Sequence, residues 1–126
     1  VEATRKALEI GIAEVRAGNT TGDIGAAIQQ YVEGEGFGVV RELIGHGVGY
    51  KVHEDPEIPN WGTRGKGAKL EKGMVIAIEP MVTEGSHGVY LAEDDWTWKT
   101  KDGKRAAHFE HTVAVTRDGA EVLTKL

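Results

Sequence analysis

Three residues have the side chains that proteins use to hold a metal ion, and each lies in an unusual setting. His46 stands in the segment GHG, with a glycine on either side. Glu79 interrupts the apolar run MVIAIEPMV, and Glu110 lies in the middle of AAHFEHTVAV. A carboxylate in a strand is more often a solvated charge at a sheet edge, and a single loop histidine is more often structural. Each feature taken alone therefore indicates little.

The two carboxylates together are harder to explain as surface charges. Side chains alternate along a strand, so Glu79 shares a face with Val75 and Ala77, and Glu110 lies in a strand expected to be half buried. Two such carboxylates in one small sheet repel each other unless a cation lies between them. Neither strand core contains Lys or Arg. A divalent metal ion would resolve the repulsion.

His46 is the natural third ligand for such an ion. Its flanking glycines allow close backbone approach and unusual dihedral angles, so the imidazole can reach a site between strands. One histidine and two carboxylates, with no sulfur, favour Mn, Fe, Co or Zn.

Other candidate residues are less well defined by the pattern. His53 follows His46 at a spacing that is uncommon for local ligands, so we expect it to contact substrate and to donate to a developing oxyanion. The alternative for His53 is a side chain that caps a turn. His108 lies on the same expected strand face as the second carboxylate, and its role stays open. Trp96 alternates with polar residues, which is more typical of packing than of binding.

The elements that position these residues follow from apolar periodicity. One amphipathic helix is expected over residues 3–17, ended by Gly18. A second begins at the N-cap Thr20, with Asp23 as its capping-box partner, and ends near Gly34. Asp-Gly in TKDGKR and in TRDGAE predicts two hairpin turns. Two helices followed by antiparallel strands indicate an α+β fold. Strands are expected at residues 38–43, 74–82, 88–92, 95–100 and 105–115.

Composition excludes several classes of protein. The chain has 126 residues, 40% of them apolar, which is enough for one domain with a core. A formal net charge of −5 without a basic patch argues against a nucleic-acid partner. No apolar run approaches the length of a membrane span, so no membrane partner is expected. The absence of cysteine excludes disulfides and suits a reducing compartment, and we expect a cytoplasmic protein.

Several ordered motifs resemble a known family. GHGVGYKVHEDP, GMVIAIEPM, DDWTWKTKDGKRAAHFEHTVAVT and GAEVLT are similar to the C-terminal half of type I methionine aminopeptidases, as is the opening ATRKALEIGIAEVRAGNTTGDIGAAIQ. The resemblance covers essentially the whole chain. It implies one domain over residues 1–126 that forms half of a pita-bread (creatinase/aminopeptidase) fold, with two helices packed on a curved antiparallel sheet. It also implies a metal-dependent hydrolase that removes the initiator Met from nascent proteins.

The resemblance assigns a role to each candidate residue. It makes His46, Glu79 and Glu110 metal ligands and gives Glu79 a further role in acid–base catalysis. His53 matches a histidine that contacts the scissile peptide, and Trp96 matches an aromatic residue at the border of the Met side-chain pocket. The family's site binds two metal ions and takes two aspartate ligands from the N-terminal half. We expect those aspartates to be absent here, leaving two carboxylates to balance one divalent ion, with weak or no activity for the chain alone.

The expected partners are the N-terminal Met of nascent peptides and either a separate N-terminal half or a second copy of this chain. The main alternative is a non-catalytic peptide- or protein-binding module on the same fold. Retention of all three ligand residues argues against that module. An unrelated structural α+β protein would require the glycine-rich segment and both carboxylates to be coincidences.

Overall fold

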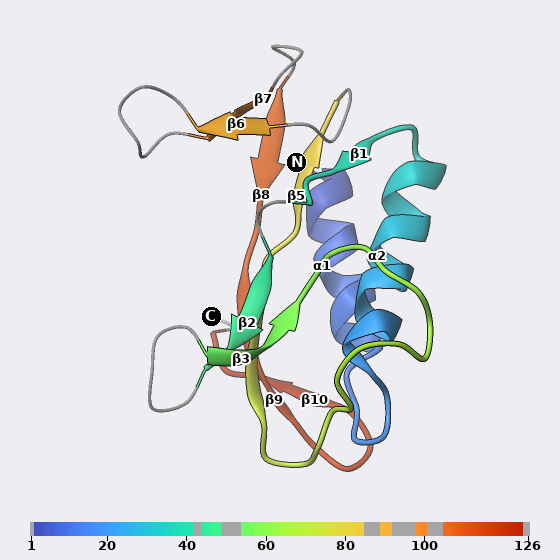
Figure 1. The fold of residues 1–126 in the computed structure, drawn as a ribbon, viewed down its shortest axis with the longest axis vertical. Helices are drawn as coiled ribbons and strands as arrows, with labels where there is room; N and C mark the ends of the chain where they lie inside the picture. The colour runs from blue at the N-terminus through green and yellow to red at the C-terminus, as the bar shows by residue number, and fades with distance from the viewer. Residues whose placement is uncertain are drawn as a thin grey trace.

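Two helices lie side by side against antiparallel β-structure (Figure 1). The structure is a computed structural model that describes residues 2–41, 44–48, 54–84, 89–91, 98–100 and 105–124. The helices and their neighbours at the start of the sheet are α1 (Glu2–Ala13), α2 (Thr21–Gly34), β1 (Gly38–Val39), β2 (Gly45–Gly47) and β3 (Glu54–Ile58). The remaining strands are β4 (Val75–Ile78), β5 (Met81–Thr83), β6 (Val89–Leu91), β7 (Trp98–Thr100), β8 (Ala106–His108), β9 (His111–Val115) and β10 (Ala120–Val122).

The strands form three groups. A five-stranded sheet has the order β10-β9-β4-β2-β3, a three-stranded sheet has the order β1-β5-β8, and β6 pairs with β7. All of the pairings are antiparallel. The predicted α+β class, with two helices on antiparallel sheet, is therefore confirmed. None of the described helices is long and apolar enough to cross a membrane.

Helix α1 ends at Ala13, four residues before the predicted end at residue 17. The backbone N–H of Ala17 donates to the carbonyl of Thr116, and that of Gly18 donates to Leu70. After a tight last turn, in which the N–H groups of Glu14 and Val15 donate to Gly11 and Ile12, the chain therefore bonds to distant segments at Ala17 and Gly18 instead of continuing the helix. The prediction that Gly18 ends this helix as its C-terminal cap is therefore wrong, although Gly18 does have a positive φ of 98° in the segment that follows.

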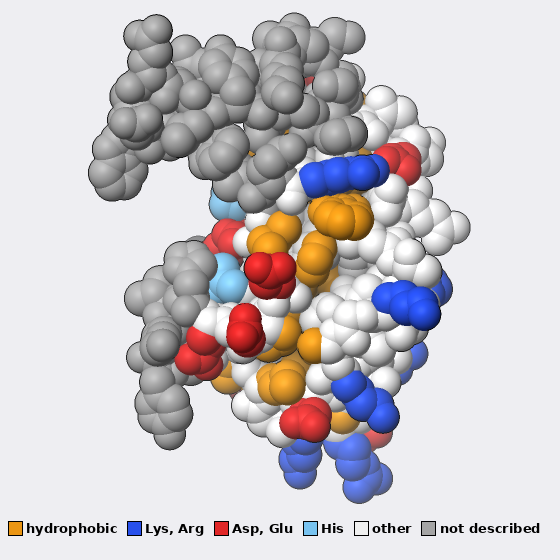
Figure 2. Space-filling view, viewed as in Figure 1, with side chains coloured by type: hydrophobic (Ala, Val, Ile, Leu, Met, Phe, Trp, Pro, Cys, Tyr) orange, Lys and Arg blue, Asp and Glu red, His pale blue; other side chains and the backbone are white. Residues whose placement is uncertain are grey.

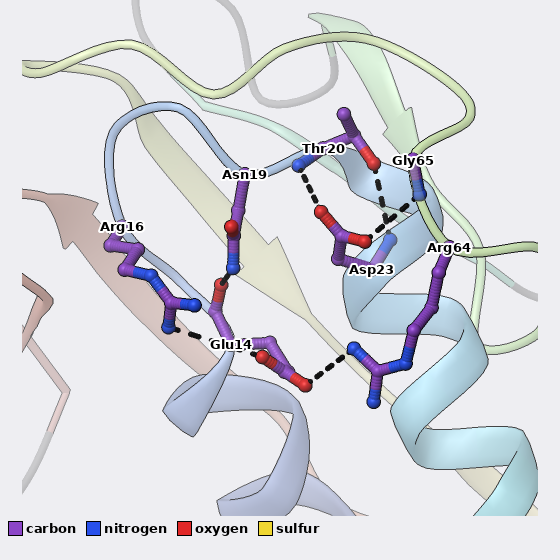
Figure 3. A network of polar contacts seen from close by, with 7 residues as sticks. All are labelled: Glu14, Arg16, Asn19, Thr20, Asp23, Arg64 and Gly65. Atoms are coloured by element: carbon purple, nitrogen blue, oxygen red, sulfur yellow. Dashed lines mark hydrogen bonds and ion pairs between the residues drawn. The ribbon is translucent and has the colours of Figure 1, made fainter.

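Helix α2 begins as the sequence predicts, with a complete capping box (Figure 3). The Asp23 N–H donates to Thr20 Oγ1 at 3.2 Å, and the Thr20 N–H donates to Asp23 Oδ2 at 2.8 Å. The other carboxylate oxygen of Asp23 accepts from the Gly65 N–H, and Arg64 forms a 2.8 Å ion pair with Glu14. The hydrogen bond from the Thr20 backbone is the largest cause that lowers the pKa of Asp23. This network joins both helices to the loop around residue 65.

The Thr20→Ala variant is expected to lower the free energy of unfolding by about 0.5–2 kcal/mol, because it removes the side-chain acceptor of the capping box and leaves the Asp23 N–H with the Thr20 carbonyl as its acceptor. Urea denaturation followed by circular dichroism measures the change. Thr63→Ala is a matched control, since Thr63 is an exposed threonine in the adjoining loop, and a change within about 0.5 kcal/mol is expected there. Equal losses in the two variants would contradict the capping role.

The two long strands predicted at 74–82 and 105–115 are each broken next to a carboxylate. Glu79 and Pro80 separate β4 from β5, and Phe109 and Glu110 separate β8 from β9. Pro80 has no N–H to donate to a ladder, which favours a break at this point. Before the break β4 pairs with β9 in the five-stranded sheet, and after it β5 pairs with β8 in the three-stranded sheet.

One of the two predicted hairpins is confirmed, and the turn of the other falls outside the described residues. Strands β9 and β10 pair across TRDGAE, with Val115 opposite Ala120, and the Thr116 N–H donates to the Gly119 carbonyl. The turn predicted at TKDGKR falls on residues 101–104, which lie outside the described residues, and the described part of β7 pairs with β6 and that of β8 with β5.

The core lies between the helices and the two larger sheets. The Gly11 position faces Ile28 of α2, and a side chain there would displace the Ile28 side chain, so the helices pack closely. The strand β4 is central in its sheet and contributes Ile76 and Ile78, both fully buried. The carboxylates at the strand break therefore sit at the edge of a well-packed region. The largest buried side chains include Ile24, Ile28, Ile58, Leu70, Ile76, Ile78, Val15, Val32, Val39, Val40 and Val113.

Candidate metal centre

The break between β4 and β5 lies beside the break between β8 and β9, and we call the two together the shared strand break. It brings Glu79 and Glu110 opposite each other. The register on the two sides of the break is continuous, so the residues in between face each other in order. The N–H of Phe109 donates to the Pro80 carbonyl at 3.4 Å within this interval. The pairs that flank the break are Ile78–His111 and Met81–His108.

His46 approaches the same point from the strand on the other side of β4. It pairs with Ala77, which lies two residues before Glu79 and so on the same sheet face. The Nε2 atom of His46 lies 3.6 Å from Glu79 Oε1, while Nδ1 lies 3.0 Å from the Gly47 carbonyl oxygen. A carbonyl only accepts, so the Nδ1–H is the donor, and Nε2 is the ring nitrogen on the side of the carboxylate.

The glycines around His46 are required for close packing of β2 between its neighbours. A Cβ atom on Gly45 would meet the carbonyl oxygen of Ala77 in β4, and one on Gly47 would meet that of Asp55 in β3. The predicted close backbone approach is thus present. Neither glycine is among those with positive φ, so the predicted unusual dihedral angles are not needed at these two positions.

The three side chains form one cluster. His46, Glu79 and Glu110 each offer a ligand atom, and these atoms all lie within 4.8 Å of one another. Figure 2 shows carboxylates beside histidines on this side of the molecule. Burial, a hydrogen bond with Glu110 and the charge of Glu110 raise the pKa of Glu79 to about 8. The carboxylates thus crowd each other enough that one keeps a proton, and a divalent cation fits in place of that proton.

Two contacts at this cluster were not predicted from sequence. Asn60 is fully buried, and its Nδ2 donates to the backbone carbonyl of Glu79 at 3.3 Å, at the point where the ladder is broken. The Nε2 atom of His108 lies 3.7 Å from Glu79 Oε2. His111, by contrast, makes a 2.7 Å hydrogen bond with Thr124.

The other predicted site residues, His53 and Trp96, lie outside the described residues. His46 also lines an open groove of about 280 Å³, together with Ile44, Gly45, Glu54, Asp55 and Glu57. The groove borders the group of His46, Glu79 and Glu110, here called the metal-type cluster, and carries three carboxylates of its own. It therefore extends the negative charge of the site along β3.

The raised pKa of Glu79 predicts how the stability of the metal-free chain depends on pH. Between its ordinary value of 4.5 and about 8, the unfolded chain loses this proton while the folded chain keeps it. The stabilising contribution is therefore complete below 4.5 and is lost as pH rises through about 8.

Urea midpoints are measured at about pH 5 and at about pH 8.5 with a chelator present. The midpoint is expected to fall more between these two pH values in the parent chain than in Glu79→Gln, because glutamine cannot titrate. The difference between the two chains isolates Glu79 from the other titrating groups. Parallel pH profiles would contradict the raised pKa.

The fold and this cluster define the class of protein: half of a pita-bread metallopeptidase. Residues 1–117 match the profile of metallopeptidase family M24, and the chain belongs to this family. The X-Pro aminopeptidase of Thermotoga maritima shares the fold at 23% identity, with a TM-score of 0.71 over 99% of this chain and 30% of its own. The fold class predicted from sequence is therefore confirmed at the level of family and architecture.

More similar proteins carry one activity in their names. The methionine aminopeptidase structure from Thermotoga maritima has a TM-score of 0.97 and 53% identity, covering 100% of this chain and 51% of its own. Methionine aminopeptidase B of Synechocystis sp. is 52% identical over 98% of this chain and 45% of its own length. Methionine aminopeptidase 1 of Bacillus subtilis is 51% identical over 100% of this chain and 51% of its own. The chain thus spans about half the length of the curated relatives it matches.

Proposed function

We propose that this chain is the metal-binding C-terminal half of a methionine aminopeptidase catalytic domain, folded as one domain over residues 1–126. The proposed reaction is hydrolytic removal of the N-terminal Met from nascent peptides in the cytoplasm. The observation that carries the proposal is the cluster of His46, Glu79 and Glu110 at a shared strand break. Similarity to methionine aminopeptidases along the whole chain supports the substrate.

In this proposal His46, Glu79 and Glu110 hold one divalent ion, chosen among Mn, Fe, Co and Zn by its nitrogen and oxygen ligands. When bound, the ion supplies a Lewis acid and an activated water for peptide hydrolysis. Two carboxylates offset the charge of one divalent ion, so the described cluster favours one ion over two. Balancing a second ion would need further ligands from outside this cluster.

The residues of the cluster have separable tasks. Glu79 is the proposed proton carrier, because a carboxyl group with a pKa near 8 both takes and gives a proton close to neutral pH. Glu110 is the exposed member of the cluster, so an additional ligand set would approach at this residue. His53 as a contact to the scissile peptide and Trp96 at the Met pocket complete the proposal.

Calorimetric titration with Mn²⁺ and a Met-peptide hydrolysis assay test the function. We expect one weakly bound Mn²⁺ and little activity from the chain alone, with activity appearing when the N-terminal half of the Bacillus subtilis relative, produced separately, is added. Two tightly bound ions would contradict the single-ion site. Absence of both binding and activity, in the chain and in the mixture, would contradict the function and favour the non-catalytic binding module.

Self-association is tested on the same sample. If two copies of the chain pair to supply the ligands that one copy lacks, light scattering should give the mass of a dimer. A clean monomer would leave a separate N-terminal half as the proposed partner.

A further inference from the structure

His108 lies at the metal-type cluster without belonging to it. Within the described chain, the group of ligand atoms lying within 4.8 Å of one another comprises His46, Glu79 and Glu110. His108 instead approaches Oε2 of Glu79, with Nε2 at 3.7 Å, whereas His46 lies nearer Oε1. Its side chain is 45% exposed, so this position is not explained by burial in the core.

The sheet register explains why two histidines meet one carboxylate. Glu79 faces Glu110 directly, and His108 pairs with Met81, two residues beyond Glu79 on the same face. His46 pairs with Ala77, two residues before Glu79 on that face. The carboxylate of Glu79 therefore has an imidazole on each diagonal, one on β2 and one on β8.

Each imidazole lies close to a different oxygen of Glu79. His46 Nε2 lies 3.6 Å from Oε1, and His108 Nε2 lies 3.7 Å from Oε2. Both separations exceed a hydrogen bond, yet both are within ion-pair range, and a small rotation of the exposed His108 ring would close the second. The two imidazoles therefore lie nearest to different oxygens of the Glu79 carboxylate.

We propose that His108 is a positioning residue that holds Oε2 of Glu79 and so presents Oε1 to the metal ion. This inference rests on the proposed function, because it assigns Glu79 as a ligand. His108 acts through Glu79 and does not itself bind the ion. Partners of this kind restrict the orientation of a ligating side chain before the ion arrives.

The first test needs no metal. Ring resonances of the histidines are compared by NMR between the metal-free parent chain and its Glu79→Gln variant. Shifts at His46 and His108 with none at His111, whose ring bonds Thr124, are expected. An unchanged His108 ring would overturn the inference, whatever the chain does with metal ions.

The second test measures Mn²⁺ affinity in substituted chains. His108→Ala is expected to weaken binding by about 10–100-fold, as loss of an outer partner does. His108→Gln is expected to recover most of this loss, because the amide N–H can donate to the same oxygen. His111→Gln is the matched control and should bind as the parent does, since His111 is one residue from Glu110 but its ring bonds Thr124.

The outcomes separate this inference from the proposed function. Parent-like affinity in His108→Ala would overturn the positioning role. Equal weakness in His108→Gln and His108→Ala would also overturn it, by showing that the ring itself is a ligand. If the NMR contact is present but the parent chain binds no Mn²⁺, the proposed function fails while the contact between His108 and Glu79 stands.

Discussion

The Glu79→Gln variant is expected to bind Mn²⁺ at least about 100-fold more weakly than the parent chain. This loss is larger than the one expected for a residue that contacts a ligand without binding the ion itself. The substitution keeps the size of the side chain but removes one of the two carboxylate charges that offset the ion. It also leaves a neutral amide, which is a poor ligand for a divalent ion. Titration calorimetry at constant pH and ionic strength measures the change.

Loss of a ligand is distinguished from loss of the fold by two further measurements. The metal-free variant should be no less stable than the parent near pH 8, since it lacks a partly buried carboxylate that Glu110 repels. Glu57→Gln is a matched control with the same charge change. Glu57 pairs with His46 across β2 and β3 but lies outside the cluster. Comparable losses of affinity in the two variants would show that overall charge, not ligation by Glu79, governs binding.

The Gly45→Ala variant is expected to lose both stability and metal binding. The added Cβ would overlap the carbonyl oxygen of Ala77, and backbone in a central strand cannot move aside as a side chain can. β2 must then separate from β4, which carries His46 away from Glu79. The free energy of unfolding should fall by about 1–3 kcal/mol or more, as for other overpacked positions. Urea denaturation and Mn²⁺ titration together measure the effect.

Gly34→Ala provides the matched control for this substitution. Gly34 is the last residue of α2, and a Cβ there meets nothing within 4 Å. Alanine at a helical position should leave stability unchanged or raise it by up to about 1 kcal/mol, with no effect on metal binding. If Gly45→Ala proves as stable as Gly34→Ala, then β2 does not pack against β4 as closely as the structure shows.

The helices were predictable because their signals are local. The capping box of Thr20 and Asp23 and the apolar stripe of α2 can be found within one stretch of sequence. The early end of α1 could not be found in this way, because Ala17 and Gly18 bond to residues 116 and 70. The same limit applies to the long strands, where period-two alternation continues across the break although the pairing passes from one sheet to another.

The cluster was predictable from residue type and charge, but its supporting contacts were not. Two carboxylates in apolar strands without a nearby cation indicated a metal, and the structure brings both together with His46. Nothing near Asn60 in sequence indicates that its amide bonds the carbonyl of Glu79. His108 could be placed on a strand face, but the oxygen it approaches depends on the register between β5 and β8.

Because the register is continuous across the strand break, the site depends on the exact number of residues between paired positions in each strand. An insertion of one residue between Ala77 and Glu79, or between His108 and Glu110, would reverse which face every later side chain in that strand occupies. One carboxylate would then point into the apolar layer, even though every ligand residue were still encoded. We therefore expect one-residue insertions at these junctions to be tolerated far less than those in the Asp-Gly turn at residues 116–119, which lies beyond Glu110.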